Sequence, residues 1–234
     1  MVKSSPTIVA NLHERISINE WHKRLGHPSH KMITHLINSF SLPTINKKNL
    51  YFCSSCSINK AHRQPFRQNS LSSHAPLNLL CTDVWGPSST TGITGARYYL
   101  IFVDYLTKYI WFYLMETKSS VRTIFPQFKN LVENQFQLKI KSAYSNNGDE
   151  FVSLKHYFTT NGISHYTTTP HTLQQNGVFE QRHRHLVETD LTLLHDASLP
   201  LQYWPCAFST AAYLINRHPT PLLHHEFSFE ILFT

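Results

Sequence analysis

Two long apolar runs near the middle of the chain, separated by two residues, restrict the fold more than any other feature. Residues 97–105 (RYYLIFVDY) and 108–115 (KYIWFYLM) are rich in aromatic and β-branched side chains, which favour strands. The short turn between them predicts a hairpin. A similar run at 77–85 precedes the pair, and shorter strands are expected at 139–144 and 163–167. The sequence therefore predicts a sheet of five strands.

Helical patterns lie between and beyond these strands. Residues 119–135 carry apolar side chains along one face, although Pro126 should kink or shorten that helix. The clearest helical pattern is at 178–197. Further helices are expected at 151–160, at 202–216 and at 19–40, the last interrupted by Gly26 and Pro28. Strands that alternate with helices in this order predict an α/β (α+β) fold, with helices packed on a mixed sheet.

Positive charge is concentrated in the first third of the chain. Residues 1–74 hold ten Lys/Arg and two Asp/Glu, a net charge of +8, whereas residues 75–234 hold 11 and 12, a net charge of −1. The polar, Ser-rich stretch 68–76 ends in proline and is typical of a linker. We therefore expect a basic module at 1–67 and a core at 77–234. Such a module favours a polyanionic partner, nucleic acid above all, or is simply a solubilising surface.

Other classes of protein fit less well. No apolar run reaches the 18 residues that a membrane span needs, and the first twenty residues lack the pattern of a secretory signal. Four cysteines, two of them in a CxxC, favour a metal site in a reducing compartment over a disulfide scaffold. The other two, Cys81 and Cys206, lie in apolar segments and are expected to be small core residues.

Two histidines and the two CxxC cysteines make a complete ligand set. His22 and His27 are five positions apart, Cys53 and Cys56 are three apart, and 25 residues separate the pairs. Two imidazoles and two thiolates are a standard tetrahedral set for structural Zn²⁺. The bend implied by Gly26 would turn His27 inward. The alternative is a chance CxxC in a chain with 16 histidines.

Acidic residues mark a second candidate site. Asp83 ends an apolar strand, Glu180 opens a basic helix, and SNNGDEF (145–151) follows a short strand. Converging carboxylates hold the divalent cations that activate attacking and leaving oxygens in phosphoryl transfer. Ordinary structural roles are also open: Asp83 in a cap of the following turn, Glu180 in a pair with Arg184, and Asp104 in the turn after its strand.

These segments, taken in order, resemble the integrase region of copia-type LTR retrotransposon polyproteins. WHKRLGHPSH and CSSCSINKAHRQPF resemble its zinc module, the GAG-pre-integrase domain. TDVWGP, YYLIFVDYLTKYIWFY, SNNGDEF, QQNGVFEQRHRH and YWPCAFSTAAYLINRHPT resemble successive parts of its catalytic core. The resemblance covers about residues 21–220. It implies an RNase H-like core and a DDE triad that binds two Mg²⁺ or Mn²⁺ for 3′-end processing and strand transfer.

The resemblance assigns a role to each matching position. His22, His27, Cys53 and Cys56 match the zinc ligands, while Asp83 and Glu180 match the first Asp and the Glu that bind Mg²⁺ or Mn²⁺. The catalytic positions are thus Asp83, Asn146 and Glu180. Asn146 stands where the family has its second Asp, in the register that Gly148 and Glu150 fix. Asn146 brings no negative charge. Asp149 lies three residues further along, and an odd offset in an extended chain points a side chain to the opposite side, so Asp149 is a poor replacement for the missing Asp. We therefore expect impaired catalysis.

The expected partner is DNA, both retroelement ends and target. The side chains expected to contact its phosphates are Lys23, Arg24, Lys47, Lys48, Lys60, Arg63, Arg182 and Arg184. The alternative for Arg182 and Arg184 is that they form a solvated helix face. A homo-oligomer is expected, with no membrane and no small-molecule substrate. A nuclear or cytoplasmic location follows from this function alone. The alternative function is a non-catalytic DNA-binding or oligomerisation remnant of a polyprotein.

Overall fold

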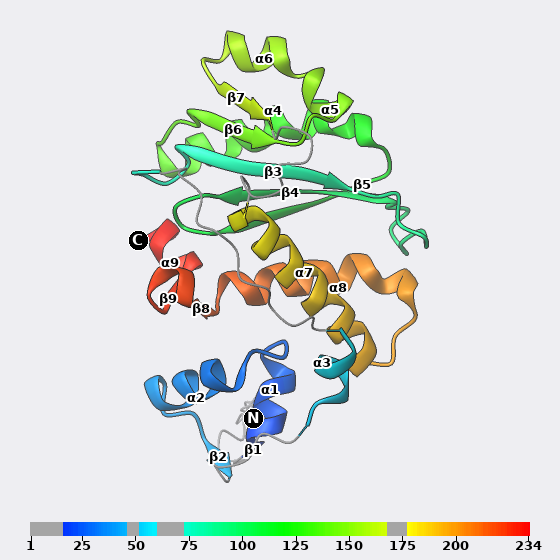
Figure 1. The fold of residues 1–234 in the computed structure, drawn as a ribbon, viewed down its shortest axis with the longest axis vertical. Coiled ribbons are helices and arrows are strands. Elements are labelled where there is room, and N and C mark those ends of the chain that lie inside the picture. The colour runs from blue at the N-terminus through cyan, green and yellow to red at the C-terminus, as the bar shows by residue number, and fades with distance from the viewer. Residues whose placement is uncertain (1–15, 46–51, 60–72, 168–176) are drawn as a thin grey trace, which may run out of the picture. The chain divides into compact units, whose positions relative to one another are not determined.

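A computed structural model gives the fold of the chain (Figure 1). It describes residues 16–45, 52–59, 73–167 and 177–234. The chain divides into two compact units, Met1–Cys53 and Ser54–Thr234. This division comes earlier than the predicted linker because helix α3 (Ser54–Asn59) packs on α7 (Gly177–Asp196), where Ser55 Oγ lies 2.9 Å from His195 Nδ1.

The first unit is a small helical module. Its elements are β1 (Ile16–Ser17), α1 (Ile18–Arg24), α2 (His30–Ser39) and β2 (Thr44–Ile45). Ser17 caps α1 and Ser29 caps α2, each accepting a hydrogen bond from a backbone N–H of the first turn. Three buried isoleucines, Ile18, Ile33 and Ile37, make its core. The predicted interruption of the 19–40 helix is thus confirmed.

The second unit is built on the predicted five-stranded sheet. The strands are β3 (Leu79–Trp85), β4 (Tyr98–Asp104), β5 (Ile110–Met115), β6 (Ser142–Ser145) and β7 (Ser164–Thr167), in the order β5-β4-β3-β6-β7. β3, β4 and β5 are antiparallel neighbours, while β6 runs parallel to both β3 and β7. The sheet is therefore mixed, as predicted, and β3 lies at its centre.

Helices cover both faces of this sheet (Figure 1). Aromatic and aliphatic side chains of α7 and α8 (Trp204–Asn216) pack with the β3 residues Leu79 and Cys81 in one core cluster. The other cluster contains the β3 residues that point to the opposite face of the sheet. These residues pack against α4 (Val121–Phe136), α5 (Asp149–Val152) and α6 (Lys155–Thr160). The remaining short elements are β8 (Pro219–Thr220), β9 (Glu226–Phe227), α9 (Ser228–Phe233) and 3-10 turns at Lys118–Ser120, Leu201–Tyr203 and Pro221–Leu223.

One expectation about a single residue was wrong in part, and another was wrong. The helix α4 runs unbroken through Pro126 to Phe136, so the proline does not shorten it. A proline inside a helix removes one N–H bond and crowds the carbonyl four residues earlier, and the buried face of α4, which includes Phe125 and Phe128, offsets that cost. Cys206 lies on the exposed side of α8, whereas Cys81 is fully buried as expected.

Asp104 has the turn role that its position after β4 suggested. Its fully buried carboxylate accepts hydrogen bonds from the backbone and hydroxyl of Thr107 and from the backbone of Leu77, all at 2.8 Å. These bonds tie the β4–β5 turn to the start of β3. None of the helices in the described segments combines the length and apolar character needed to cross a bilayer.

Candidate metal centres

The loop after α1 brings two histidines together. Gly26 and His27 both adopt positive φ, +74° and +59°, so the chain reverses direction and the His27 N–H donates to the His22 carbonyl at 2.7 Å. A glycine accepts this conformation easily. His27 Nδ1 consequently lies 3.1 Å from His22 Nε2, and both rings are buried. The predicted inward turn of His27 is confirmed.

Two cysteines complete this cluster. Cys53 Sγ lies 3.3 Å from His27 Nδ1, and the ligand atoms of His22, His27, Cys53 and Cys56 all lie within 4.8 Å of one another. Bonds of about 2.0–2.3 Å to a tetrahedral Zn²⁺ would separate such ligands by roughly 3.3–3.8 Å, so these spacings fit a metal site. The carbonyl oxygen of Pro28 lies 3.0 Å from His22 Nδ1, a contact that orients that ring.

Sheet register explains how Asp83 and Asn146 become neighbours. Cys81 on β3 pairs with Tyr144 on the parallel strand β6. Each candidate residue lies two positions further along its own strand direction, so both side chains project on the same side of the sheet. That side is the one covered by α7, which carries Glu180.

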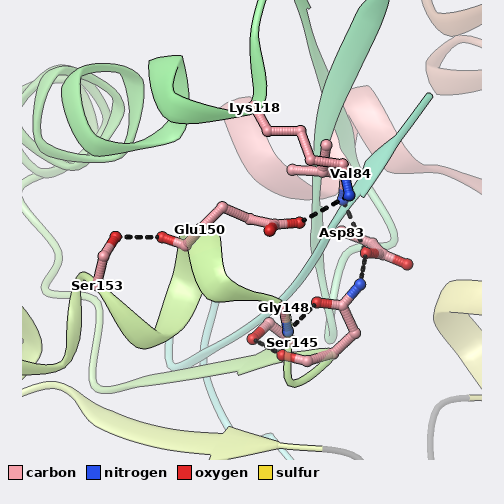
Figure 2. A network of polar contacts seen from close by, with 8 residues as sticks. Asp83, Val84, Lys118, Ser145, Gly148, Glu150 and Ser153 are labelled. Carbon is pink, nitrogen blue, oxygen red and sulfur yellow. Dashed lines mark hydrogen bonds and ion pairs between the residues drawn. The ribbon is translucent and has the colours of Figure 1, made fainter. Parts of the chain in front are cut away.

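Asp83 and Asn146 are joined directly (Figure 2). Asn146 Nδ2 donates to Asp83 Oδ1 at 2.5 Å, and the same carboxylate oxygen accepts the N–H of Val84 at 2.7 Å. The amide oxygen of Asn146 accepts the N–H of Gly148 at 3.0 Å. Position 146 therefore faces the first carboxylate, and it presents a hydrogen-bond donor where a second carboxylate would present an acceptor.

The surroundings of Asp83 disfavour its charged form. Burial is the main cause and raises the pKa of Asp83 from 3.8 to about 6, and the negative charge of Glu150 raises it further. The Val84 N–H and the ammonium of Lys118 act in the opposite direction. A buried carboxyl beside another carboxylate is an arrangement that a bound divalent cation would stabilise.

Glu180 lies in the first turn of α7 and is half-buried. Burial raises the pKa of its carboxyl, and Arg184, one turn later, lowers it. Across the described segments, the one place where three or more His, Cys, Asp or Glu ligands converge is the His/Cys cluster. The structure brings Asp83 and Asn146 together, and it places Glu180 in the first turn of the helix that covers the same side of the sheet.

The residues expected to contact DNA fall into three groups. Lys23 and Arg24 are exposed on α1, and Arg184 is half-exposed on α7. Arg182 is only 3% exposed and donates to Ser228 Oγ at 2.8 Å, so it lies in the interior and not on a DNA-facing surface. Lys47, Lys48, Lys60 and Arg63 lie outside the described residues.

Sequence reasoning missed two neighbours of Asp83. Glu150 served only to fix the register of SNNGDEF, and Lys118 had no assigned role. The structure places Lys118 Nζ 3.7 Å from Glu150 Oε1 (Figure 2). The signal that could have found Glu150 is its position inside the motif, four residues after Asn146 and at the start of a helical turn.

Comparison with known proteins identifies relatives of most of the chain. Residues 1–61 match the GAG-pre-integrase domain family. The retrovirus-related Pol polyproteins of transposons RE2 and RE1 of Arabidopsis thaliana are 50% and 46% identical over 92% and 97% of this chain. That of transposon TNT 1-94 of Nicotiana tabacum is 35% identical over 91%. The chain spans only 15–16% of the length of these relatives.

Solved structures share the fold. The HTLV-2 integrase catalytic core domain in complex with magnesium, in trimeric form, matches with a TM-score of 0.50 and 18% identity over 70% of this chain and 99% of that one. The simian T-cell lymphotropic virus intasome in complex with PP2A regulatory subunit B56 gamma matches with a TM-score of 0.56 and 15% identity over 93% and 75%. The chain is thus homologous to one stretch of the retrovirus-related Pol polyproteins of copia-type retrotransposons, and it carries a GAG-pre-integrase match followed by an integrase-fold core.

Proposed function

We propose that this chain is an integrase core of the class that performs 3′-end processing and strand transfer on DNA, with its catalysis impaired at Asn146. The observation that carries the proposal is the 2.5 Å contact between Asn146 Nδ2 and Asp83 Oδ1. It means that position 146 stands where a second ligand would share a cation with the first. A neutral amide there weakens the attraction for a pair of divalent cations.

In this proposal Asp83 and Glu180 are the remaining acidic ligands of the catalytic cations. Mg²⁺ or Mn²⁺, when bound, activates the attacking oxygen and stabilises the leaving oxygen of phosphoryl transfer. The protein must hold these ions with hard oxygen ligands. Asp83 does so from a central strand, where the sheet fixes its position, and Glu180 from the first turn of a long helix. The second acidic position is the one that is lost.

The His/Cys cluster supports a structural role for Zn²⁺. Two thiolates and two imidazoles suit zinc better than they suit Mg²⁺ or Mn²⁺. The cluster ties the loop after α1 to Cys53 and Cys56, in a module whose described core consists of a few isoleucines. A small module of this kind needs such a staple to stay folded.

DNA is the proposed partner and a homo-oligomer the proposed assembly. The solved neighbours include an intasome and a trimeric integrase core, which supports both proposals. Phosphate contacts are assigned to Lys23, Arg24 and Arg184 of the described residues, together with Lys47, Lys48, Lys60 and Arg63. Contacts of this kind weaken with salt and carry little sequence information. A nuclear or cytoplasmic location would suit this partner.

A second function is favoured by Asn146 itself. A chain that keeps all four His/Cys ligands but has an amide in its catalytic site could serve as a DNA-binding or oligomerisation unit without chemistry of its own. The two functions share the fold and the DNA partner. They differ in one respect, which is whether a carboxylate restored at position 146 is enough to give DNA joining.

A strand-transfer assay separates the two. Zinc-loaded chain and its Asn146→Asp variant would be incubated with Mn²⁺ and a labelled DNA end. We expect the variant to join DNA at least about a hundredfold faster, the order of effect that one charge-stabilising group has in an active site. The matched control is the double variant Asn146→Asp, Asp83→Asn, which should lose that gain.

Zinc content, measured for every protein, shows that the His/Cys cluster has formed, and a cooperative denaturant unfolding transition shows that the core is folded, so that inactivity is not misfolding. An unmodified chain that joins DNA as fast as the variant would contradict the proposed impairment. If neither protein joins DNA although both contain zinc, the non-catalytic function is supported.

A further inference from the structure

Glu150 is a buried carboxylate held close to the Asn146 turn. It is the second residue of α5 and is 8% exposed, and its buried Oε1 accepts no hydrogen bond from the described part of the chain. Its carboxylate is folded back over Gly148: a Cβ placed on that glycine would lie 2.7 Å from Cδ and Oε1 and 2.8 Å from Oε2. Gly148 is thus the residue that leaves room for the carboxylate beside this turn.

Gly148 links this carboxylate to the candidate catalytic residues. Its N–H donates to Asn146 Oδ1 at 3.0 Å, and Asn146 Nδ2 in turn donates to Asp83. Figure 2 shows the polar network that contains Asp83, Gly148 and Glu150. The charge of Glu150 also raises the pKa of Asp83, as expected for a like charge in its surroundings.

A cation already faces both carboxylates. Lys118 Nζ lies 3.7 Å from Glu150 Oε1, and its charge lowers the pKa of Asp83. The Lys118 side chain is 47% exposed, whereas that of Glu150 is 6% exposed. A long, half-exposed lysine side chain can move away at little cost. An open pocket of about 500 Å³, lined by Lys118, Gly148 and Glu150 among others, gives ions access to this side of the site.

Leaving a buried carboxylate oxygen without a hydrogen bond is costly. Such a group persists when it serves a ligand, and the ligand that suits two close carboxylates is a hard divalent cation. The Asn146 amide can contribute to the same ion if it rotates by half a turn. Rotation would bring the Oδ1 acceptor to the ion in place of the Nδ2 donor, and it would cost the hydrogen bond that Oδ1 accepts from the Gly148 N–H.

We propose that Glu150 and Asp83 together bind one divalent cation, Mg²⁺ or Mn²⁺, so that Glu150 supplies the second carboxylate that position 146 does not. This rests on the proposed function in one respect only, the assignment of Asp83 as a metal ligand. The ion displaces the Lys118 ammonium from the carboxylate pair. The site is complete within Ser54–Thr234.

The test is Mn²⁺ binding to the zinc-loaded full chain, measured by the electron paramagnetic resonance signal of free Mn²⁺. Glu150→Gln should weaken binding at least about tenfold, since loss of an outer-shell partner alone costs 10–100-fold. Asp83→Asn should weaken it similarly. The matched control is Glu230→Gln, which makes the same substitution at an exposed residue of α9, and its affinity should stay within about twofold of the unmodified chain.

Lys118→Met gives an independent readout that does not disturb a buried residue. If the ammonium competes with the ion, this variant should bind Mn²⁺ several-fold more tightly. Unchanged affinity in Glu150→Gln, together with weakened binding in Asp83→Asn, would overturn the role of Glu150 and leave the proposed function standing. Affinity that is insensitive to all four substitutions would remove the metal assignment of Asp83 as well.

Discussion

Asp83 shows what a partly buried carboxylate costs the stability of the fold. Its carboxyl is half-buried on the central strand, and this burial raises its pKa from 3.8 to about 6. The folded state therefore holds a proton on Asp83 more tightly than the unfolded state does. By linkage, the contribution of Asp83 to stability falls as the pH rises from about 4 to about 6, and the penalty is complete above that range.

Asp83→Asn should consequently stabilise the metal-free core at pH 7. The amide keeps an acceptor for the Val84 N–H and for Asn146 while removing the buried charge. A shift of about two pKa units corresponds to roughly 3 kcal/mol, so we expect a gain of about 1–3 kcal/mol in the free energy of unfolding. The gain should shrink as the pH falls from 7 to 5. Denaturant unfolding of zinc-loaded protein without Mg²⁺ or Mn²⁺ measures it.

The exposed Asp149 provides the control for this experiment, because Asp149→Asn should change stability by less than about 0.5 kcal/mol. A loss of stability in Asp83→Asn at pH 7 would show that the carboxylate is favourable where it lies, and that its burial carries no electrostatic penalty.

At the scale of elements, the edge of the sheet is closed by a side chain. β5 is an edge strand, and Asn216 at the end of α8 bonds both backbone groups of Ile110, accepting its N–H and donating to its carbonyl, each at 2.8 Å. Asn216 is 3% exposed. Asn216 therefore pairs the backbone groups of Ile110 that a neighbouring strand would otherwise pair. It also fixes α8 to the side of the sheet on which Asp83 lies.

Asn216→Ala should destabilise the core by about 2–3 kcal/mol, because it leaves a buried N–H and a buried carbonyl without partners. Asn216→Asp, although nearly isosteric, should do no better, since it repels the Ile110 carbonyl. Thr210→Ala on the exposed side of α8 is the comparison variant and should cost less than about 0.5 kcal/mol. A near-neutral Asn216→Asp in thermal unfolding would mean that side-chain volume, not hydrogen bonding, matters at this position.

Strand and helix identity could be predicted from local pattern, because the strands β3–β5 and the helix α7 are long and strongly periodic. Features that depend on contacts between distant segments could not be predicted in this way. The Cys81–Tyr144 register, which makes Asn146 a neighbour of Asp83, depends on pairing between distant segments. The same holds for the packing of α3 on α7 and for the burial of Arg182, whose sequence neighbours are polar.

The candidate site was predicted unevenly for the same reason. The His/Cys ligands can be recognised by residue type and spacing, and the turn at Gly26 completes them. Glu150 gives no comparable signal, because an acidic residue at the start of a short helix is ordinary. Its role becomes visible only when the backbone folds its carboxylate over Gly148.

At the scale of the whole molecule, the chain corresponds to about 15% of the Pol polyproteins to which it is related. Within that stretch lie a His/Cys cluster whose ligand types suit zinc and the proposed carboxylate site, whose ligand types suit harder ions. The first depends on one local loop and a CxxC. The second depends on the whole sheet, and in the proposed function it is the site that lacks a charge at Asn146.

Anomalous scattering from Mn²⁺ soaked into crystals of the zinc-loaded chain tests the carboxylate site most directly, because it locates each bound ion. We predict one Mn²⁺ between Asp83 and Glu150 in the unmodified chain. In the Asn146→Asp variant we predict a second ion beside Asp83, held by the restored carboxylate. Two ions at Asp83 in the unmodified chain, or none there in either protein, would contradict an impairment caused by the missing charge at position 146.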